Sequence, residues 1–303
     1  MKNELSSNVA SSIKENIKHL CSEKEPIQTE IKPDLKKLKG IKAVYFDVYG
    51  TILISGTEPG IRNNRERQIE LLNVSLKEFG VDVKEDAAEE GIALLHKGIE
   101  AYHAKKREEG IDYPEVDIIL IWENVITELI KKGLISSLEI EKVPEFLTDF
   151  VIRYDDPWLM PGLNETIEGL HETGKKTGII SNSSFYTPYT LEALAEKDLS
   201  EMGFKEPDCF WSFAEDIAKP SVQFYEIAKA HLKSAYNIEA EEMLFVGNDM
   251  LNDVYPANKA GFKTALFAGD LRSLRLREGD SRVENLTPDI TITELTQILE
   301  CIF

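Results

Sequence analysis

Six short apolar runs, most of them separated by helical patterns, constrain the fold of this chain more than any other feature. Each run has the length of a buried strand, and continuous apolar runs are typical of parallel strands that are covered on both faces. The runs are residues 41–46, 176–180, 208–213, 243–246, 263–267 and 289–292. Strands that alternate with helices imply right-handed crossovers and a parallel sheet. The sequence therefore predicts a Rossmann-like α/β core with helices on both sides of the sheet.

Helical patterns fill most of the intervals between these runs. Asn164 is expected to cap a helix that Gly174 closes, because these residue types satisfy free backbone groups at helix ends. Thr187 is expected to be a second N-cap, with Pro188 in the first turn, where its missing N–H costs nothing. A third helix is expected over residues 221–232.

The stretch between the first and second strands shows helical spacing only. Apolar side chains recur there three or four residues apart, as in Ala88, Ile92, Leu95, Ile99 and Tyr102. Such a block predicts an inserted α-helical cap domain, which forms a lid over the carboxyl ends of the strands. The alternative is that these helices only pack on the sheet.

The predicted organisation has three parts. Residues 41–55 and 156–303 form the α/β core, and residues 56–155 form the cap. Residues 1–40 are polar, and they are expected to be an N-terminal extension with one short helix followed by a linker. A chain of 303 residues is long enough for a core and a smaller inserted domain.

The formal net charge of −19 limits the partners of the chain. A field of this sign repels nucleic acid and anionic membranes, so neither is expected as a partner. No apolar run approaches the roughly 20 residues of a membrane span, and residues 1–30 lack the apolar stretch of a secretory signal. We expect a cytoplasmic protein that acts on a small molecule, and an anionic substrate would need a local cation. No pattern indicates the oligomeric state.

Asp47 ends the first predicted strand and is followed by Gly50 and Thr51. This order places a carboxylate at the ligand-binding edge of an open α/β sheet. The glycine lets backbone N–H groups approach an anion closely. Taken alone, the motif is also compatible with a strand end and a turn-forming aspartate.

Three further segments follow predicted strands in order. The first ends in Ser181 and Asn182, a hydroxyl and an amide that can bind an anionic oxygen. The second presents the Lys219 ammonium just before a helix, with Tyr225 six residues on. Each of these has a structural explanation by itself, such as a helix cap or a surface lysine.

The last segment contains Asn248, Asp249 and Asp253, so that two carboxylates stand four residues apart. Because ligands bind at the carboxyl ends of the strands in an open α/β sheet, the four segments are expected to converge.

Together the four segments resemble the motifs of the haloacid dehalogenase superfamily, and the resemblance covers about residues 41–290. It implies that Asp47 attacks the substrate and carries it covalently, which splits one difficult step into two. For a phosphate substrate it also implies Mg²⁺, a hard cation that takes oxygen ligands. The implied ligands are Asp47, the backbone carbonyl of Tyr49 and Asp249, with Asp253 bound directly or through another group.

The resemblance also implies how the substrate is held. Ser181 and Lys219 would hold the transferring group and offset its charge, and Thr51 would contact the same group or orient Asp47. Further substrate-binding candidates are Gly50, Asn182, His96 and Tyr225.

Tyr49 departs from the family's phosphatases, which have an aspartate two residues after the nucleophile as acid for the leaving alcohol. A phenol has an unperturbed pKa of about 10, which makes it a poor substitute. A tyrosine at this position is instead characteristic of the family's 2-haloacid dehalogenases, whose halide leaves without a proton. The interval between Lys219 and Tyr225 also resembles the dehalogenases.

The fourth motif argues against dehalogenation, because dehalogenases work without a metal and Asp249 and Asp253 match a metal-binding spacing. A looser alignment puts Asn248 at the metal position. Dehalogenases also supply an arginine from the cap, and the corresponding helix has His96 instead. Other possible donors in the cap are Arg62, Arg65, Arg67 and Arg107.

Three functions stay open. The favoured one is Mg²⁺-dependent hydrolysis of a small phosphate ester. The first alternative is dehalogenation of a 2-haloacid, or another carbon-centred hydrolysis, without a metal. The second is a binding or regulatory module of the same fold that turns over poorly because Tyr49 replaces the acid.

Overall fold

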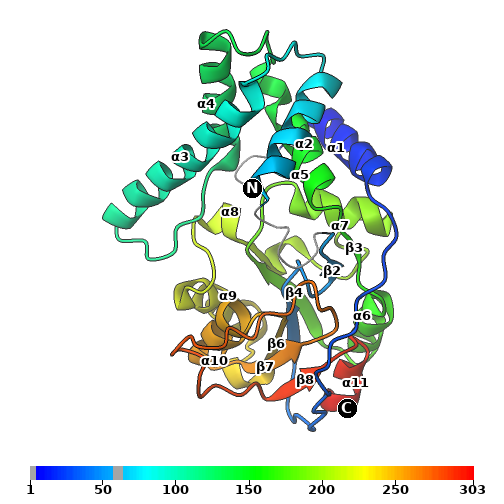
Figure 1. Cartoon of the computed structure of the whole chain (residues 1–303). Coiled ribbons are helices and arrows are strands. Elements are labelled where there is room, and N and C mark those ends of the chain that lie inside the picture. The colour runs from blue at the N-terminus through cyan, green and yellow to red at the C-terminus, as the bar shows by residue number, and fades with distance from the viewer. Residues whose placement is uncertain (1–4, 57–63) are drawn as a thin grey trace. The chain divides into compact units, whose positions relative to one another are not determined.

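The computed structural model describes residues 5–56 and 64–303 of the chain. It divides into two compact units, which we describe separately (Figure 1). The helical unit comprises Met1–Ser22 and Gly56–Pro157, and the sheet unit comprises Glu23–Ser55 and Trp158–Phe303. Arg62, one of the candidate arginines, lies outside the described residues.

In the sheet unit, the described residues form a six-stranded parallel sheet with the order β5-β4-β1-β6-β7-β8. The strands are β1 (Ala43–Phe46), β4 (Lys176–Ser181), β5 (Cys209–Trp211), β6 (Met243–Gly247), β7 (Lys263–Phe267) and β8 (Ile290–Ile292). Every residue of β1 and β6 is buried, as their continuous apolar sequences require. All six apolar runs therefore contain a strand, and the predicted fold class is confirmed.

Helices cover both faces of this sheet. In Figure 1, α9 and α10 lie on one side, and α6 and α11 lie on the other. These helices are α6 (Leu163–Glu172), α9 (Val222–Tyr236), α10 (Tyr255–Ala260) and α11 (Gln297–Ile302). The remaining elements of the unit are β2 (Leu53–Ile54), β3 (Trp158–Leu159), α7 (Thr187–Ala195), α8 (Ser212–Glu215), and the single turns η2 (Glu206–Asp208), η3 (Ala240–Glu242) and η4 (Met250–Val254).

Two helix starts differ from the prediction. Gly162, not Asn164, is the N-cap of α6, because its carbonyl already accepts the N–H of Thr166 at 3.0 Å. Helix α7 begins at Thr187 itself, and Tyr186 precedes it as the N-cap. Each helix therefore starts one to two residues earlier than the residue types alone indicated.

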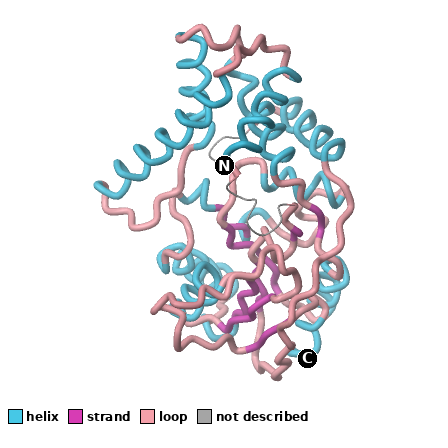
Figure 2. The backbone as a smooth tube through the Cα atoms, in the orientation of Figure 1, coloured by secondary structure: helices cyan, strands magenta, loops and turns pink. Residues whose placement is uncertain are grey.

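The helical unit contains α1 (Ser7–Leu20), α2 (Arg65–Glu78), α3 (Ala87–Glu108), α4 (Ile118–Lys131), η1 (Ile140–Lys142) and α5 (Val143–Tyr154). Helix α5 is central, because α1, α2 and α4 all pack on it. The strands drawn in magenta in Figure 2 belong to the sheet unit. The named elements in the described part of this unit are helices, and a cap over residues 56–155 that acts as a lid stays a prediction.

The first 40 residues are divided between the two units. Helix α1 is part of the helical unit, where its apolar residues Ile13 and Ile17 are buried. The following segment runs along the sheet unit, where Asp34 pairs with Thr291 of β8. The segment predicted as an extension and linker is therefore packed along most of its described length.

No helix within the described ranges is both long enough and apolar enough to cross a membrane. The three cysteines, Cys21, Cys209 and Cys301, are not joined by disulfides.

Candidate active site

Lys219 joins two carboxylates at the carboxyl edge of the sheet. Its Nζ lies 2.6 Å from Oδ1 of Asp47 and 2.6 Å from Oδ1 of Asp253. All three residues are buried, with exposed fractions of 7% for Asp47, 6% for Lys219 and 1% for Asp253. Residues that are 172 and 34 positions apart in sequence thus form one compact charged cluster.

Each member of the cluster comes from a different element. Asp47 directly follows β1, and its N–H donates to the carbonyl of Val246 in the neighbouring strand β6 at 2.9 Å. Asp253 lies in η4, a single π-helical turn just after β6. Lys219 precedes α9. The parallel arrangement of β1 and β6 therefore brings the two carboxylates to one edge.

Asn182 holds the backbone of Lys219 in place. The N–H of Lys219 donates to Oδ1 of Asn182 at 2.7 Å, and Nδ2 of Asn182 donates to the carbonyl of Lys219 at 3.1 Å. Both ends of the amide are used in this way, so Asn182 positions Lys219, and its contact with substrate stays a prediction. The neighbouring Ser181 is buried, and its hydroxyl donates to the carbonyl of Asn182 at 3.4 Å.

The electrostatics of the cluster are those of a buried ion triad. Burial alone would lower the pKa of Lys219, but the charges of Asp253 and Asp47 outweigh it, so the pKa lies above its ordinary value. Burial raises the pKa of Asp253, although the Lys219 charge opposes this shift. With both carboxylates ionised, the triad carries one net negative charge, which would repel an anionic substrate unless a further cation is present.

The turn after Asp47 is built around Gly50, which has a φ of +88°. A side chain there would collide with Ser273 and with the Asn248 amide, so only glycine fits. Thr51 donates to Oδ1 of Asn248 at 3.2 Å, and Nδ2 of Asn248 donates to the carbonyl of Ser273 at 2.5 Å. Thr51 therefore orients Asn248, and Asn248 faces the loop that follows Asp47.

Asp249 is held in a different environment. Its carboxylate accepts the N–H groups of Leu251 and Asn252 at 2.9 and 3.1 Å, and so caps η4. The guanidinium of Arg277 donates to both of its oxygens, from Nε at 3.0 and 3.1 Å and from Nη2 at 2.5 Å. The carboxylate implied as a metal ligand is thus already paired with an arginine.

Tyr49 directs its hydroxyl to α7, where it lies 3.1 Å from Oγ1 of Thr187. The same oxygen of Thr187 accepts the N–H of Ser184 at 3.2 Å, which ties the loop after β4 to the first motif.

Tyr225 and His96 are two further residues that were predicted to bind substrate. The ring of Tyr225 is fully buried against Phe245, and its hydroxyl donates to the carbonyl of Asn252 at 3.0 Å. Its hydroxyl therefore supports η4, and a contact of Tyr225 with substrate stays a prediction. His96 is exposed on α3 in the helical unit, and its contact with substrate stays a prediction.

Sequence reasoning missed Ser273 and Arg277. Both come from the segment after β7, which pairs with the fourth motif through a bridge between Asp249 and Arg275. The sequence did contain a sign of this contact, because three arginines follow the strand predicted at residues 263–267 in an acidic chain. They are Arg272, Arg275 and Arg277. Cations at that position reach the same edge of the sheet as the acidic motif.

Among the described residues, no three histidine, cysteine, aspartate or glutamate side chains form a group that could hold a metal. The Asp249 carboxylate is paired with Arg277, and its neighbour Asn248 carries an amide. Asp47, Asp253 and Asn248 supply side-chain oxygen atoms at this edge of the sheet.

Comparison with known proteins identifies the family. Residues 41–261 match the family model described as haloacid dehalogenase-like hydrolase. A glyceraldehyde 3-phosphate phosphatase of Pyrococcus furiosus is 30% identical over 173 residues, which are 55% of this chain and 66% of that protein. The enzyme of the same name from Pyrococcus abyssi is 27% identical over 139 residues, which are 44% of this chain and 55% of that protein. The chain thus spans less than two thirds of the length of each relative.

Among solved structures, the 2-haloacid dehalogenase of Pseudomonas syringae pv. Tomato is similar, with a TM-score of 0.56. The match covers 86% of this chain and 97% of that protein at 18% identity. At this identity the similarity concerns the fold alone.

Proposed function

The chain belongs to the haloacid dehalogenase-like hydrolase family, and from this membership we propose that it hydrolyses a small phosphate ester through a covalent intermediate on Asp47. The observation that carries the proposal is the contact of Lys219 with Asp47 and Asp253 at 2.6 Å each. A buried carboxylate held by a buried ammonium at the ligand edge of the sheet has the character of an oriented nucleophile.

The proposed reaction has two steps. Lys219 holds one oxygen of Asp47, and the other oxygen attacks phosphorus, so that a new P–O bond forms while the ester P–O bond breaks. The departing oxygen takes a proton from water. A water molecule then attacks the phosphorus of the aspartyl phosphate, which releases inorganic phosphate and restores the Asp47 carboxylate.

Lys219 contributes positive charge at the position where negative charge develops on the phosphoryl group. Asp253 and the amide of Asn182 keep its ammonium and its backbone in place. Ser181 lies beside them at the end of β4 and is a candidate donor to a phosphoryl oxygen.

The groups near Asp47 suit Mg²⁺, because they offer oxygen atoms, which are the ligands that Mg²⁺ takes. We assign the metal to Asp47, the backbone carbonyl of Tyr49 and Asn248, with Asp253 bound directly or through a water. Asn248 is preferred to Asp249 because its amide oxygen accepts from Thr51 of the nucleophile loop, whereas Asp249 is paired with Arg277. When bound, the ion supplies the positive charge that offsets repulsion between Asp47 and a phosphate dianion.

The proposed substrate class is a phosphate monoester of a small metabolite. The printed name of both Pyrococcus relatives, glyceraldehyde 3-phosphate phosphatase, supports this class. Because Tyr49 stands where a carboxylic acid would protonate the leaving alcohol, substrates with good leaving groups are expected to react fastest.

A second candidate is hydrolytic dehalogenation of a 2-haloacid, in which Asp47 displaces halide from carbon. Tyr49 favours it, since a halide needs no proton. The pairing of Asp249 with Arg277 also favours it, because this chemistry needs no metal.

The test is a panel assay on the purified full chain. Glyceraldehyde 3-phosphate, p-nitrophenyl phosphate and 2-chloropropionate are each incubated with Mg²⁺ or with a chelator, and phosphate and halide are measured. The proposal expects Mg²⁺-dependent phosphate release that is lost in Asp47→Asn. Halide release that survives the chelator would establish the second candidate instead, and release of neither product would leave the fold as a binding module.

A further inference from the structure

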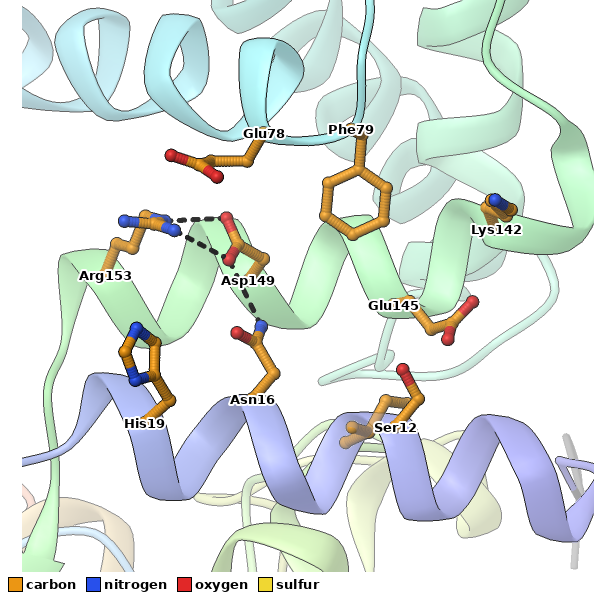
Figure 3. A pocket seen from close by; sticks show the side chains of 10 residues that line it. Ser12, Asn16, His19, Glu78, Phe79, Lys142, Glu145, Asp149 and Arg153 are labelled. Carbon is orange, nitrogen blue, oxygen red and sulfur yellow. Dashed lines mark hydrogen bonds and ion pairs between the residues drawn. The ribbon is translucent and has the colours of Figure 1, made fainter.

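A hollow of about 460 Å³ opens in the helical unit between α1, the end of α2 and α5 (Figure 3). Its volume lies within the range of small-molecule sites. All of its lining residues belong to the helical unit, and α1 supplies Ser12, Asn16 and His19. The helix predicted within the N-terminal extension therefore builds one wall of a hollow.

The guanidinium of Arg153 is fixed at one end of the hollow. It donates to Asp149 from Nε at 2.7 Å and from Nη2 at 3.1 Å, and Asn16 of α1 donates to the same carboxylate at 3.1 Å. Asp149 is only 2% exposed, so its buried carboxylate fixes the positions of Arg153 and Asn16. A guanidinium has five N–H donors. Three remain on Arg153 for another partner, and its side chain is 22% exposed.

Glu78 faces Arg153 from the end of α2, as Figure 3 shows. Within the described residues, Asp149 is the only carboxylate at ion-pair distance from Arg153. Glu78 is close enough to contribute to the raised pKa of Arg153, after the larger effect of the hydrogen bond that Arg153 donates to Asp149. A fixed cation and a carboxylate thus face each other without closing into a pair.

The middle of the hollow is aromatic and its far end is polar. Phe79 lies between the two ends in Figure 3, and its ring packs edge-on against Phe146 with centroids 5.7 Å apart. Lys142, Glu145 and Ser12 lie at the far end. None of these three side chains has a hydrogen bond or ion pair with another described residue.

The charges of the lining select the ligand class. Asp149 and Arg153 neutralise each other, and Glu78 and Glu145 outnumber the remaining cation, Lys142. A phosphate-rich anion would therefore be repelled. Guanidinium forks match carboxylates, and a nearby carboxylate matches an ammonium. An α-amino acid carries both groups on one carbon.

We propose that this hollow binds a free α-amino acid, with its carboxylate on Arg153, its ammonium on Glu78 and its side chain along Phe79 toward Glu145. The site is separate from the proposed hydrolase chemistry and does not depend on it. The competing explanation is that the hollow is a seam between helices filled by water, because Ile13 and Ile17 anchor α1 without any ligand.

The experiment is a calorimetric titration of the full chain with each of the common L-amino acids. At least one should bind with a dissociation constant of about 1 mM or tighter. Its N-acetyl and methyl ester derivatives, which each lack one charge, should bind about 10-fold or more weakly. If no amino acid saturates below about 10 mM, the proposal is wrong.

Two substitutions in the hollow test whether the amino acid binds there. Glu78→Gln should weaken binding about 10-fold or more, and Arg153→Lys should do the same while still neutralising Asp149. The matched control is Glu141→Gln, an exposed residue of η1 that does not line the hollow, and it should bind as the unmodified chain does. Thermal unfolding of each variant separates lost binding from lost folding. Unchanged affinity in a folded Glu78→Gln variant would overturn the assignment.

Discussion

Arg277 donates hydrogen bonds to both carboxylate oxygens of Asp249, with Nη2 2.5 Å from Oδ2 and Nε 3.0 Å from Oδ1. Asp249 in turn caps η4, and its own N–H donates to Oδ2 of Asp253 at 2.9 Å. Because Asp253 holds Lys219 and Lys219 holds Asp47, a surface arginine is linked by direct contacts to the proposed nucleophile.

Arg277→Gln is therefore expected to lower kcat by about 10-fold, with KM for the same substrate changed little, because the variant loosens η4 and leaves the nucleophile in place. Steady-state kinetics on p-nitrophenyl phosphate measure both constants. Arg282→Gln is the matched control, since Arg282 pairs with Asp280 in the same segment. Equal rates for the two variants would show that the link has no influence on turnover.

The affinity of variants for Mg²⁺ tests whether Asn248 or Asp249 is the metal ligand. Asn248→Asp places a carboxylate beside the nucleophile loop, and it is expected to tighten Mg²⁺ binding about 10-fold or more. Asp249→Asn should change that affinity by less than about threefold, because Arg277 already occupies the carboxylate. Calorimetric titration with Mg²⁺ measures both effects without relying on activity. The opposite ranking of the two variants would assign the metal to Asp249.

Lys219→Met should destabilise the fold by about 3–5 kcal/mol, because it leaves two buried carboxylates without a counter-charge. Denaturant unfolding measures the loss. The comparison variant is Lys229→Met, which removes a lysine paired with Glu226 at the surface and should cost about 1 kcal/mol or less. A loss no larger than that of Lys229→Met would mean that the triad contributes little to stability.

Tyr49→Asp would introduce an acid for the leaving alcohol. It is expected to raise kcat on an alkyl phosphate such as glyceraldehyde 3-phosphate by about 10²-fold, and to change turnover of p-nitrophenyl phosphate little, because that leaving group needs no proton. Tyr49→Phe controls for loss of the hydroxyl that contacts Thr187. The expectation fails if both substrates respond to Tyr49→Asp by the same factor.

The parallel sheet, and the convergence of Asp47, Lys219 and Asp253 at one edge, followed from the sequence. Apolar runs of strand length cannot be exposed, and alternation with helices makes the strands parallel. The end of each run then locates a polar residue at the common carboxyl edge. These features depend on residues that are close together in the sequence, so the sequence alone is enough to predict them.

The contacts of Asn182, Tyr225 and Arg277, and the different partners of Asn248 and Asp249, appeared only in the tertiary structure. Asn182 contacts a residue 37 positions away, and Arg277 contacts one 28 positions away. Adjacent residues such as Asn248 and Asp249 have the same local pattern but point to different neighbours, Thr51 and Arg277. The physical reason is that a side chain's partner depends on which segments pack against it, and that packing exists only once the chain has folded.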